Sequence, residues 1–377
     1  MLIGYIFICV LFSVFTYGFI DLNLHITTSP LFLALQKPLE MLVYQMRPVA
    51  AGIFLSFLVL LFIWYMWFLR SGEKIVSVKK VFLLLSLVAI IFVFSFPAFS
   101  YDIFNYITTA KVTFFHNENP YLVMPIEITG EPYLAFTRAA NKVALYGPVW
   151  ILLTAIPHYL GSGAIWQTII AFKLINALFY LIASYLIYKM TKQVKSVLFF
   201  AANPLVLIEV LISTHNDISM MVLVLTGILL WFSKGIGNKI MGVFAMLAST
   251  LIKGATVVLL PLLFVKSLTK EQFLTYAYLL LGVVFFIAAP IREELYPWYA
   301  VWLVTLAACL DGKKYETLRS FTIVLSFALE LRQLPYIYMG YYAGVGPIAR
   351  TLLTVVPLLI FGVYTLGKKT VRKSNHA

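Results

Sequence analysis

Apolar runs separated by short polar turns make up most of this sequence. A helix needs about 20 apolar residues to cross roughly 30 Å of hydrocarbon. The pattern therefore predicts an all-α bundle of about twelve membrane spans in a single integrated domain, 1–377. We expect the spans near 1–20, 49–69, 81–99, 164–189, 196–213, 218–232, 240–252, 255–266, 272–290, 298–310, 319–335 and 347–366.

The stretch 100–163 interrupts this pattern and predicts one long extracytoplasmic loop. Residues 103–115 carry apolar side chains at helical spacing, which indicates an interfacial helix. Residues 146–160 are apolar enough to cross the membrane, but a crossing there would move the basic turn at 189–195 to the outer side. We therefore expect 146–160 to form a helix that lies on the membrane surface or dips into it.

Composition agrees with a membrane protein. Apolar residues make up 62% of the chain, charged residues make up 11%, and the mean hydropathy is +0.95. Soluble enzymes, disordered chains and disulfide scaffolds are excluded, because soluble domains carry about a quarter charged residues. Cys9 and Cys309 stand far apart in apolar runs and offer neither a disulfide framework nor metal-ligand spacing.

The net charge of +13 is unevenly distributed along the chain. Turns on one side of the predicted membrane hold eighteen Lys and Arg and four acids, whereas the other side holds six Lys and Arg and nine acids. Because basic turns remain in the cytoplasm, we expect this side, with both termini, to be cytoplasmic. The distribution explains the charge without a nucleic-acid partner.

Polar residues gather at the outer ends of the predicted spans. Asp102 follows the third span, where a partly dehydrated carboxylate can accept a proton from a hydroxyl nucleophile; alternatively, it caps the following helix. Glu209 lies inside the fifth span, where an acid is costly and is a functional candidate. His215, Asn216 and Asp217 follow that span, and the alternative there is a polar turn in which Asp217 caps the next helix.

Two lysines at membrane depth require partners. Lys253 separates the short runs 240–252 and 255–266, which predicts a hairpin or a broken helix at this point. Its partner is either a lipid phosphate or an internal acid such as Glu209. For Lys173 we expect the side chain to snorkel to the interface.

A late polar segment combines charge with aromatic residues. Arg292 either steers a phosphate or pairs with Glu293 or Glu294. Trp298 and Tyr299 either flank a sugar or form part of an interfacial belt. The sequence contains no phosphate-binding loop, GxGxxG, HExxH or GxSxG motif, so nucleotide-driven chemistry and zinc hydrolysis have no support.

Over about 95–300, the ordered set of motifs resembles the glycosyltransferase-C (GT-C) superfamily, with the closest likeness to polyprenyl-phosphate-mannose-dependent mannosyltransferases. The departures are Gly147, where a second proline is common, and a single acid at Asp102 rather than an adjacent pair. The matching residues are Asp102 with Tyr106, Asn119-Pro120-Tyr121, Tyr146-Gly147-Pro148, Asn203-Pro204, His215-Asn216-Asp217, Lys253 with Pro261, and Pro297-Trp298-Tyr299.

The resemblance implies transfer of a mannose-like hexose from a polyprenyl-phosphate donor to a hydroxyl of a glycan or lipid acceptor, with inversion. It implies Asp102 as the base and Lys253 and Arg292 as phosphate ligands. The implied substrate-binding residues are Tyr101, Tyr106, Asn119, Tyr121, Tyr146, Glu209, His215, Asn216, Asp217, Trp298 and Tyr299.

The partners implied are the lipid-linked donor, the acceptor and the lipids of a bacterial or archaeal cell membrane. No cofactor is expected and no metal ligands are assigned, although a divalent cation is left open. Two alternatives differ in class. A secondary transporter or lipid-linked-sugar flippase would show two similar six-span halves, which this sequence does not. A structural subunit would tolerate loss of the polar residues.

Overall fold

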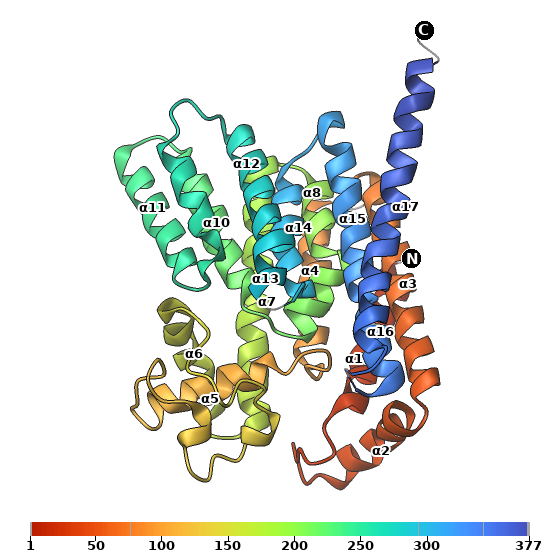
Figure 1. Ribbon diagram of the computed structural model, residues 1–377, viewed down its shortest axis with the longest axis vertical. Helices are drawn as coiled ribbons and strands as arrows, with labels where there is room; N and C mark the ends of the chain where they lie inside the picture. The colour runs from red at the N-terminus through yellow and green to blue at the C-terminus, as the bar shows by residue number, and fades with distance from the viewer. Residues whose placement is uncertain (1, 76, 293, 342, 375–377) are drawn as a thin grey trace.

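The computed structural model describes residues 2–75, 77–292, 294–341 and 343–374, with side chains except those of 72–75, 292 and 369–374. Helices make up 77% of the chain and the described residues contain no strand, which confirms the all-α prediction (Figure 1). The elements are α1 Leu2–Phe15, η1 Thr16–Phe19, α2 Pro30–Gln45, α3 Arg47–Ile75, α4 Val78–Val93, α5 Asp102–Phe114, η2 Pro125–Glu127, η3 Leu134–Phe136, α6 Pro148–Gly161, α7 Ile165–Thr191, α8 Val194–Ala201, α9 Pro204–Val206, η4 Leu207–Ile212, α10 Asp217–Trp231, α11 Ile236–Thr250, η5 Gly254–Phe264, α12 Lys270–Val283, η6 Val284–Ala288, α13 Ala289–Arg292, η7 Pro297–Tyr299, α14 Ala300–Cys309, η8 Lys313–Tyr315, α15 Glu316–Glu330, α16 Gln333–Met339 and α17 Gly346–Ser374.

Within the described residues, five helices are long and apolar enough to cross a membrane, and a pair bent by 53° at Ala202-Asn203 makes a sixth candidate. Each of the twelve predicted spans coincides with a helical segment, but the count of twelve is not confirmed. Several of these segments are too short to cross a membrane, because they begin at polar residues partway along the molecule. α10 begins at Asp217, and η5 begins directly after Lys253.

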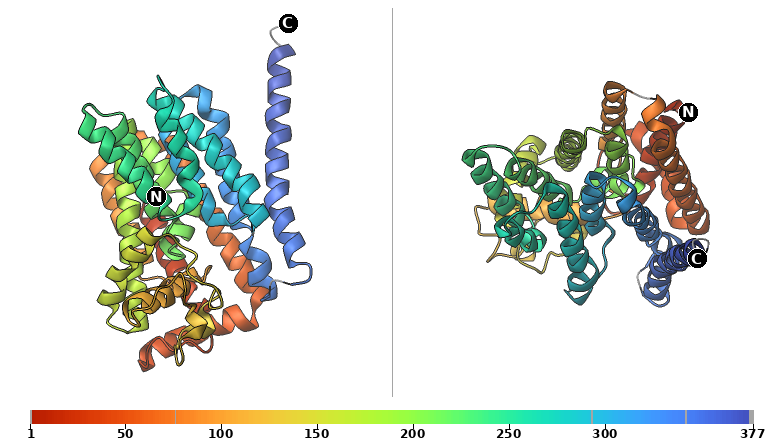
Figure 2. Two further views of the ribbon diagram at one scale, coloured as in Figure 1. Left: turned by 60° about the vertical axis from the view of Figure 1, so that its left-hand side comes forward. Right: turned by 90° about the horizontal axis from the view of Figure 1, so that it is seen from above.

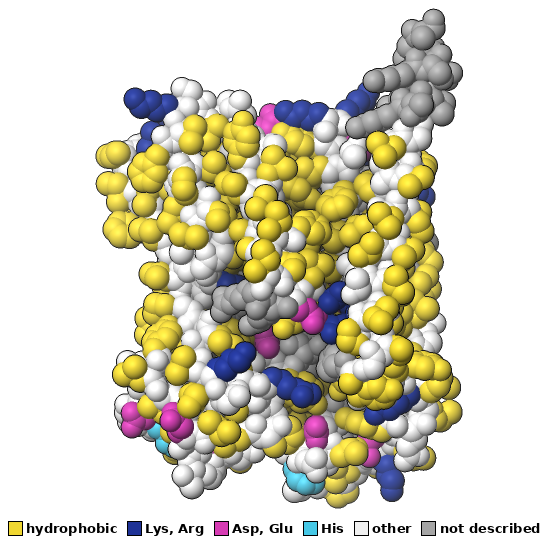
Figure 3. All heavy atoms as spheres, viewed as in Figure 1, with side chains coloured by type: hydrophobic (Ala, Val, Ile, Leu, Met, Phe, Trp, Pro, Cys, Tyr) yellow, Lys and Arg dark blue, Asp and Glu magenta, His cyan; other side chains and the backbone are white. Residues whose placement is uncertain are grey.

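The molecule has two distinct ends. The α10–α11 turn, the start of α12, the start of α15 and the end of α17 lie at one end, and α2, α5 and α6 lie at the other (Figure 1). Lys and Arg side chains line the first of these ends, with apolar side chains next to them (Figure 3). The two helices expected in 100–163 form as α5 and α6, whereas α2 and α16 were not predicted.

α11 and η5 are two separate elements that join at a turn over 251–253 and contact each other. The sequence predicted either a hairpin or a broken helix here, and the structure shows the hairpin. η5 is a 3₁₀-helix, which contains Pro261. In Figure 1, the end of α11 that leads into this turn lies at mid-height of the molecule rather than at either end.

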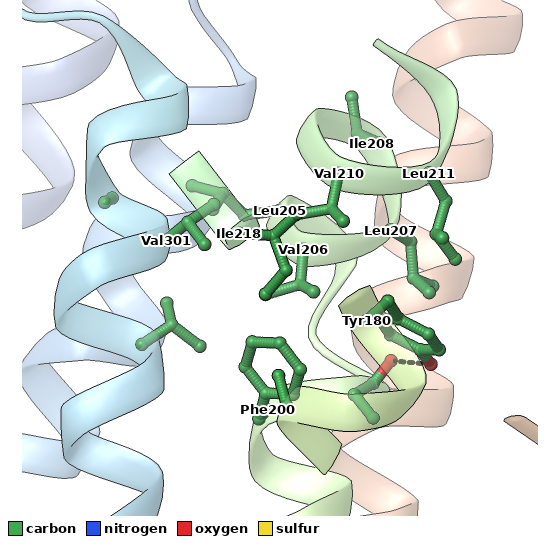
Figure 4. Packing of buried hydrophobic residues seen from close by; sticks show 14 of the residues in the cluster. Tyr180, Phe200, Leu205, Val206, Leu207, Ile208, Val210, Leu211, Ile218 and Val301 are labelled. Carbon is green, nitrogen blue, oxygen red and sulfur yellow. Dashed lines mark hydrogen bonds between the residues drawn. The ribbon is translucent and has the colours of Figure 1, made fainter. Parts of the chain in front are cut away.

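Buried apolar side chains from η4, α10 and α14 form the core behind this turn (Figure 4). Leu205, Ile218 and Val301 are fully buried there, and Tyr180 on α7 donates a hydrogen bond of 2.8 Å to the carbonyl of Ala201. Lipid tails are as apolar as leucine, so such helices are held together by close packing and by interhelical hydrogen bonds. A fixed core of this kind provides a rigid support for the polar residues around it.

α17 stands at the edge of the bundle in both views of Figure 2. Only 11% of its most apolar window is buried, the lowest share among the candidate spans. It packs mainly on α15 and α16. One side of the bundle is therefore closed by a single loosely covered helix.

Candidate active site

A cavity of about 1160 Å³ lies between the α5–α6 end of the molecule and the start of the short helix η5. Its walls come from the N-terminus of α5, the turns before α6 and η5, the α13–η7 loop, and the facing ends of α16 and α17. Side chains of Lys, Arg, Asp and Glu are visible around this level in Figure 3. The cavity is large enough for a sugar with its linking group.

Asp102 is the first residue of α5 and lines the cavity with 27% of its side chain exposed. Its Oδ1 accepts a hydrogen bond of 3.3 Å from Asn105 Nδ2, and Asn105 in turn accepts one of 3.0 Å from the backbone N–H of Ala139. The residue before the helix is Tyr101, and no side-chain cap bond forms. The capping alternative for Asp102 is therefore wrong.

His215 lies between Asp102, on the cavity wall, and the buried Glu209. Its Nδ1 lies 3.4 Å from Asp102 Oδ2, and its Nε2 lies 3.2 Å from Glu209 Oε2. Trp298 stacks on the imidazole with ring centroids 4.0 Å apart and planes inclined by 17°. Thr214, directly before it, has a φ of 67°, a conformation uncommon for a β-branched residue. The chain accepts this strain at the point where it turns the imidazole toward Asp102.

The π-helix η4 places Glu209 beneath this turn. Asn203 accepts a hydrogen bond of 3.0 Å from the N–H of Leu205, and Pro204 occupies the first helical position, so the Asn-Pro pair starts the segment. The wider turn of η4 then ends at Ile212, where the N–H of His215 donates to the carbonyl of Glu209 at 3.0 Å. π-turns of this kind are frequent at functional sites.

The charges of Asp102 and His215 support each other. Partial burial raises the pKa of Asp102, but His215 and Lys253 outweigh burial and hold this pKa below its ordinary value of 3.8. His215 lies in the turn between η4 and α10. Burial lowers its pKa, but the carboxylates of Asp102 and Glu209 outweigh burial and raise it to about 9. At neutral pH the site therefore holds an ionised Asp102 against an imidazolium.

Lys253 is held by Asp217 on the same side of the cavity. Its Nζ lies 3.0 Å from both carboxylate oxygens of Asp217, and Trp302 donates a hydrogen bond of 2.6 Å to Oδ1. The ammonium group also lies 4.4 Å from the ring centroid of Tyr299. Asp217 is fully buried and makes no cap bond, so its capping alternative is wrong. The partner of Lys253 is therefore an internal acid, as one of the two alternatives predicted, but this acid is Asp217 rather than Glu209.

Gly147 joins this turn to the α6 end of the molecule. Its N–H donates to the carbonyl of Ile252 at 3.0 Å, and the N–H of Val149 donates to the carbonyl of Leu251 at 3.1 Å. A Cβ on Gly147 would lie 2.0 Å from the Leu251 oxygen. Glycine is required here by close backbone approach, which explains why this chain departs from a second proline.

The predicted substrate-binding residues fall into three positions. Tyr101, Tyr146, Trp298 and Tyr299 line the cavity together with Asp102 and Lys253. Buried directly behind the wall are Tyr106, Glu209, His215, Asn216 and Asp217.

The third position is a more distant loop. Asn119 accepts a hydrogen bond of 3.0 Å from the N–H of Tyr121, and the Tyr121 hydroxyl donates one of 2.9 Å to the carbonyl of Tyr146. Tyr106, behind the wall, accepts a bond of 3.3 Å from the N–H of Asn216. Asn119 and Tyr121 thus support the wall from outside the cavity. The side chain of Arg292 lies outside the described residues.

Five charged residues that line the cavity were not predicted as site residues: Arg138, Lys142, Glu294, Arg332 and Arg350. Arg332 and Arg350 lie within or next to predicted spans, where a basic residue is costly, and this cost was the available signal. Glu330 was also not predicted; it is fully buried beside Glu209.

Lys173 does not snorkel to the interface, contrary to the prediction. Its side chain is buried and donates hydrogen bonds of 2.7 and 2.8 Å to the carbonyls of Leu211 and Ile212. These carbonyls stand at the end of η4, where helical carbonyls lack partners. Among the described residues, no group of three or more His, Cys, Asp or Glu side chains is arranged to hold a metal ion.

Comparison with known proteins gives one match. The family model described as alpha-(1->6)-mannopyranosyltransferase, N-terminal domain, matches residues 4–269, well over half of the chain. No curated protein matches, and no solved structure matches. The matched range contains Asp102, His215, Asp217 and Lys253.

Proposed function

The chain belongs to the alpha-(1->6)-mannopyranosyltransferase family, a GT-C-type family of enzymes, and from this premise we propose that it moves a mannose-like hexose from a polyprenyl-phosphate donor to an acceptor hydroxyl. Membership in an enzyme family argues against the transporter, flippase and structural-subunit alternatives. The observation that carries the proposal is Asp102, an ionised carboxylate on a cavity wall with Lys253 nearby.

In the proposed reaction, the acceptor oxygen attacks the anomeric carbon from the face opposite the phosphate. The bond between this carbon and the phosphate oxygen breaks, and the configuration inverts. The hydroxyl proton passes to Asp102, and the lipid phosphate leaves as an ionised ester. Because the leaving group is already stable as an anion, it needs a positive field more than a proton donor.

The buried residues position these groups. His215 and Asn105 fix the carboxylate of Asp102, and Asp217 fixes the ammonium of Lys253 at the cavity. Tyr101, Trp298 and Tyr299 offer aromatic faces to the sugar. Arg292 remains a predicted phosphate ligand. We place the basic end of the molecule in the cytoplasm with both termini, and the cavity on the opposite side.

The test is Asp102→Asn in purified protein given polyprenyl-phosphate mannose and an acceptor glycolipid. We expect the release of lipid phosphate to fall by about two orders of magnitude or more, since a positioned general base contributes 10²–10⁴-fold. Donor binding should change little, whereas the unfolding temperature should fall, because Asp102 is one of the two carboxylates that raise the pKa of His215. Glu118→Gln, which removes an exposed carboxylate at the same end of the molecule, is the matched control. Full turnover in Asp102→Asn would exclude the role of base.

A further inference from the structure

A second charged cluster lies on the cavity wall that α16 and α17 form. Arg332 Nη2 lies 2.9 Å from Glu294 Oε1, and Arg332 Nη1 donates a hydrogen bond of 3.1 Å to Thr354. Arg350, on α17, contacts both oxygens of the same carboxylate, with 3.3 Å between Nη1 and Oε2. Two guanidinium groups thus hold a single carboxylate.

Both guanidinium groups share the carboxylate of Glu294. Among the described residues, Lys253 forms its ion pair with Asp217. The side chains of Arg332 and Arg350 are only 8% and 16% exposed, so their charges are poorly screened by solvent. Paired guanidinium groups in this geometry bind a carboxylate or a phosphate in a bidentate manner.

The same wall adjoins the apolar surface of the molecule. The cavity is lined by Pro290 of α13 and by Pro347 and Val355 of α17. Val355 is 41% exposed, and Leu352 on the same helix is 55% exposed. A ligand held by Arg350 therefore has an apolar surface beside it, between α13 and α17. An anionic group attached to an apolar chain matches both features.

Glu294 is linked through aromatic stacking to the site of Asp102. Two residues after Glu294, Tyr296 stacks on Trp298 with ring centroids 4.3 Å apart, and Trp298 stacks on His215. His215 contacts Asp102. One short loop and two stacked ring pairs thus connect Glu294 to the imidazole that positions the carboxylate.

We propose that Arg332 and Arg350 form the binding site for the phosphate of a lipid phosphate, and that Glu294 is an internal carboxylate which this phosphate displaces. The proposal rests on the proposed function, since it assigns the donor's phosphate within the same cavity. It adds that the main positive charge for this group comes from α16 and α17 rather than from Lys253. It also makes Glu294 a competitor of the ligand.

The experiment measures binding by calorimetry in lipid nanodiscs, with farnesyl phosphate, farnesol and inorganic phosphate as probes. We expect farnesyl phosphate to bind at least tenfold more tightly than either other probe. Binding of farnesol equal to that of farnesyl phosphate would overturn phosphate recognition. Binding of inorganic phosphate equal to that of farnesyl phosphate would overturn the lipid assignment.

Variants distinguish whether Glu294 competes with the ligand or only forms a structural ion pair with Arg332 and Arg350. Arg350→Gln should raise the Kd for farnesyl phosphate about tenfold or more, because a charge-assisted bidentate pair is lost. Glu294→Gln should lower this Kd several-fold. Weaker or unchanged binding in Glu294→Gln would overturn the proposal. Lys37→Gln, which removes an exposed charge on α2, should have no effect.

Two further measurements keep the result decisive. Arg350→Lys retains the charge without the bidentate geometry, so it should show an intermediate Kd and serves if Arg350→Gln does not fold. Asp102→Asn should bind farnesyl phosphate like the wild type. The Kd for farnesyl phosphate can shift in opposite directions in Glu294→Gln and Arg350→Gln while the protein transfers no sugar from any donor. That result would exclude the proposed function but would still support the phosphate site.

Discussion

At the scale of single residues, Asp217 and Lys253 form the most demanding contact of the site. Asp217 is fully buried, and Lys253 and Trp302 satisfy its carboxylate. A buried ion pair adds little net stability, but removal of one partner leaves an uncompensated charge. Stability of the whole site therefore depends on both residues being present.

Asp217→Ala should lower the free energy of unfolding by about 3–5 kcal/mol, because Lys253 loses its partner and Trp302 its acceptor. The measurement is thermal or denaturant unfolding in detergent. The double variant Asp217→Leu with Lys253→Met removes both charges and should recover part of this loss. Equal losses in the single and double variants would mean that the pair is not coupled.

His215 makes stability depend on pH in the alkaline range. Its pKa in the folded protein is about 9, above the ordinary value of 6.5. The stabilisation is fully present below about pH 6.5 and is lost as the pH rises through 9, at about 1.4 kcal/mol per unit of pKa shift. Unfolding temperatures measured from pH 6 to 10 should fall more steeply in the wild type than in His215→Gln. Parallel curves would contradict this assignment.

At this scale, the sequence predicted which residues form the site better than it predicted which residues contact one another. Asp102, His215, Asp217 and Lys253 were all predicted and all meet at one site. The partner of Lys253 stayed open between a phosphate and an acid, because Asp217 lies 36 positions away and approaches only when α10 and α11 pack together. Arg332 and Arg350 were not predicted, although both lie within the spans expected at 319–335 and 347–366, where a basic residue is costly.

At the scale of elements, the turn over 251–253 is fixed by the backbone of the α6 turn. Gly147 and Val149 donate their N–H groups to Ile252 and Leu251. These two bonds determine where Lys253 enters the cavity. The element that carries the cation is thus positioned by a segment about a hundred residues earlier in the chain.

Gly147→Ala should displace Lys253, because the added methyl group meets a backbone oxygen rather than a flexible side chain. We expect a stability loss of about 1–3 kcal/mol, as in other overpacked sites, together with reduced transfer activity. Gly254→Ala is the control, since a Cβ there has open space. Equal behaviour of the two variants would argue against the close approach.

Hydropathy predicted where helices occur better than where they begin and end. α10, α11 and η5 begin and end close to the limits expected for the spans 218–232, 240–252 and 255–266, whereas α4 ends at Val93, before the expected limit at 99. α2 was not predicted because Lys37, Pro38 and Glu40 interrupt its apolar pattern. The window thus overestimates the length of α4, whereas Asp217 and Lys253 correctly indicated where α10 and η5 begin.

At the scale of the whole molecule, charge separates the two ends. The basic turns at one end and the cavity-bearing α5–α6 end lie on opposite sides of the apolar surface (Figures 1 and 3). From the positive-inside rule we expect the basic end to face the cytoplasm. The charge asymmetry was readable from sequence alone, because it depends on the alternation of turns and not on how the helices pack.

Single cysteines report this orientation in intact cells. Glu118→Cys, in the exposed loop after α5, should react with a membrane-impermeant maleimide. Gly237→Cys, at the exposed start of α11, should react only after the membrane is permeabilised. Both variants are made in a background without Cys9 and Cys309. The reverse labelling pattern would invert the orientation.

The π-turn η4 has a consequence for how this protein tolerates insertions and deletions. One residue more than an α-turn fits between Leu207 and Ile212. Loss of any single residue there would rotate the following imidazole by about 100° around the helix axis, away from Asp102. The direction of the imidazole therefore depends on the number of residues in this segment, so we expect a change of length there to be tolerated less well than a substitution of one of its apolar side chains.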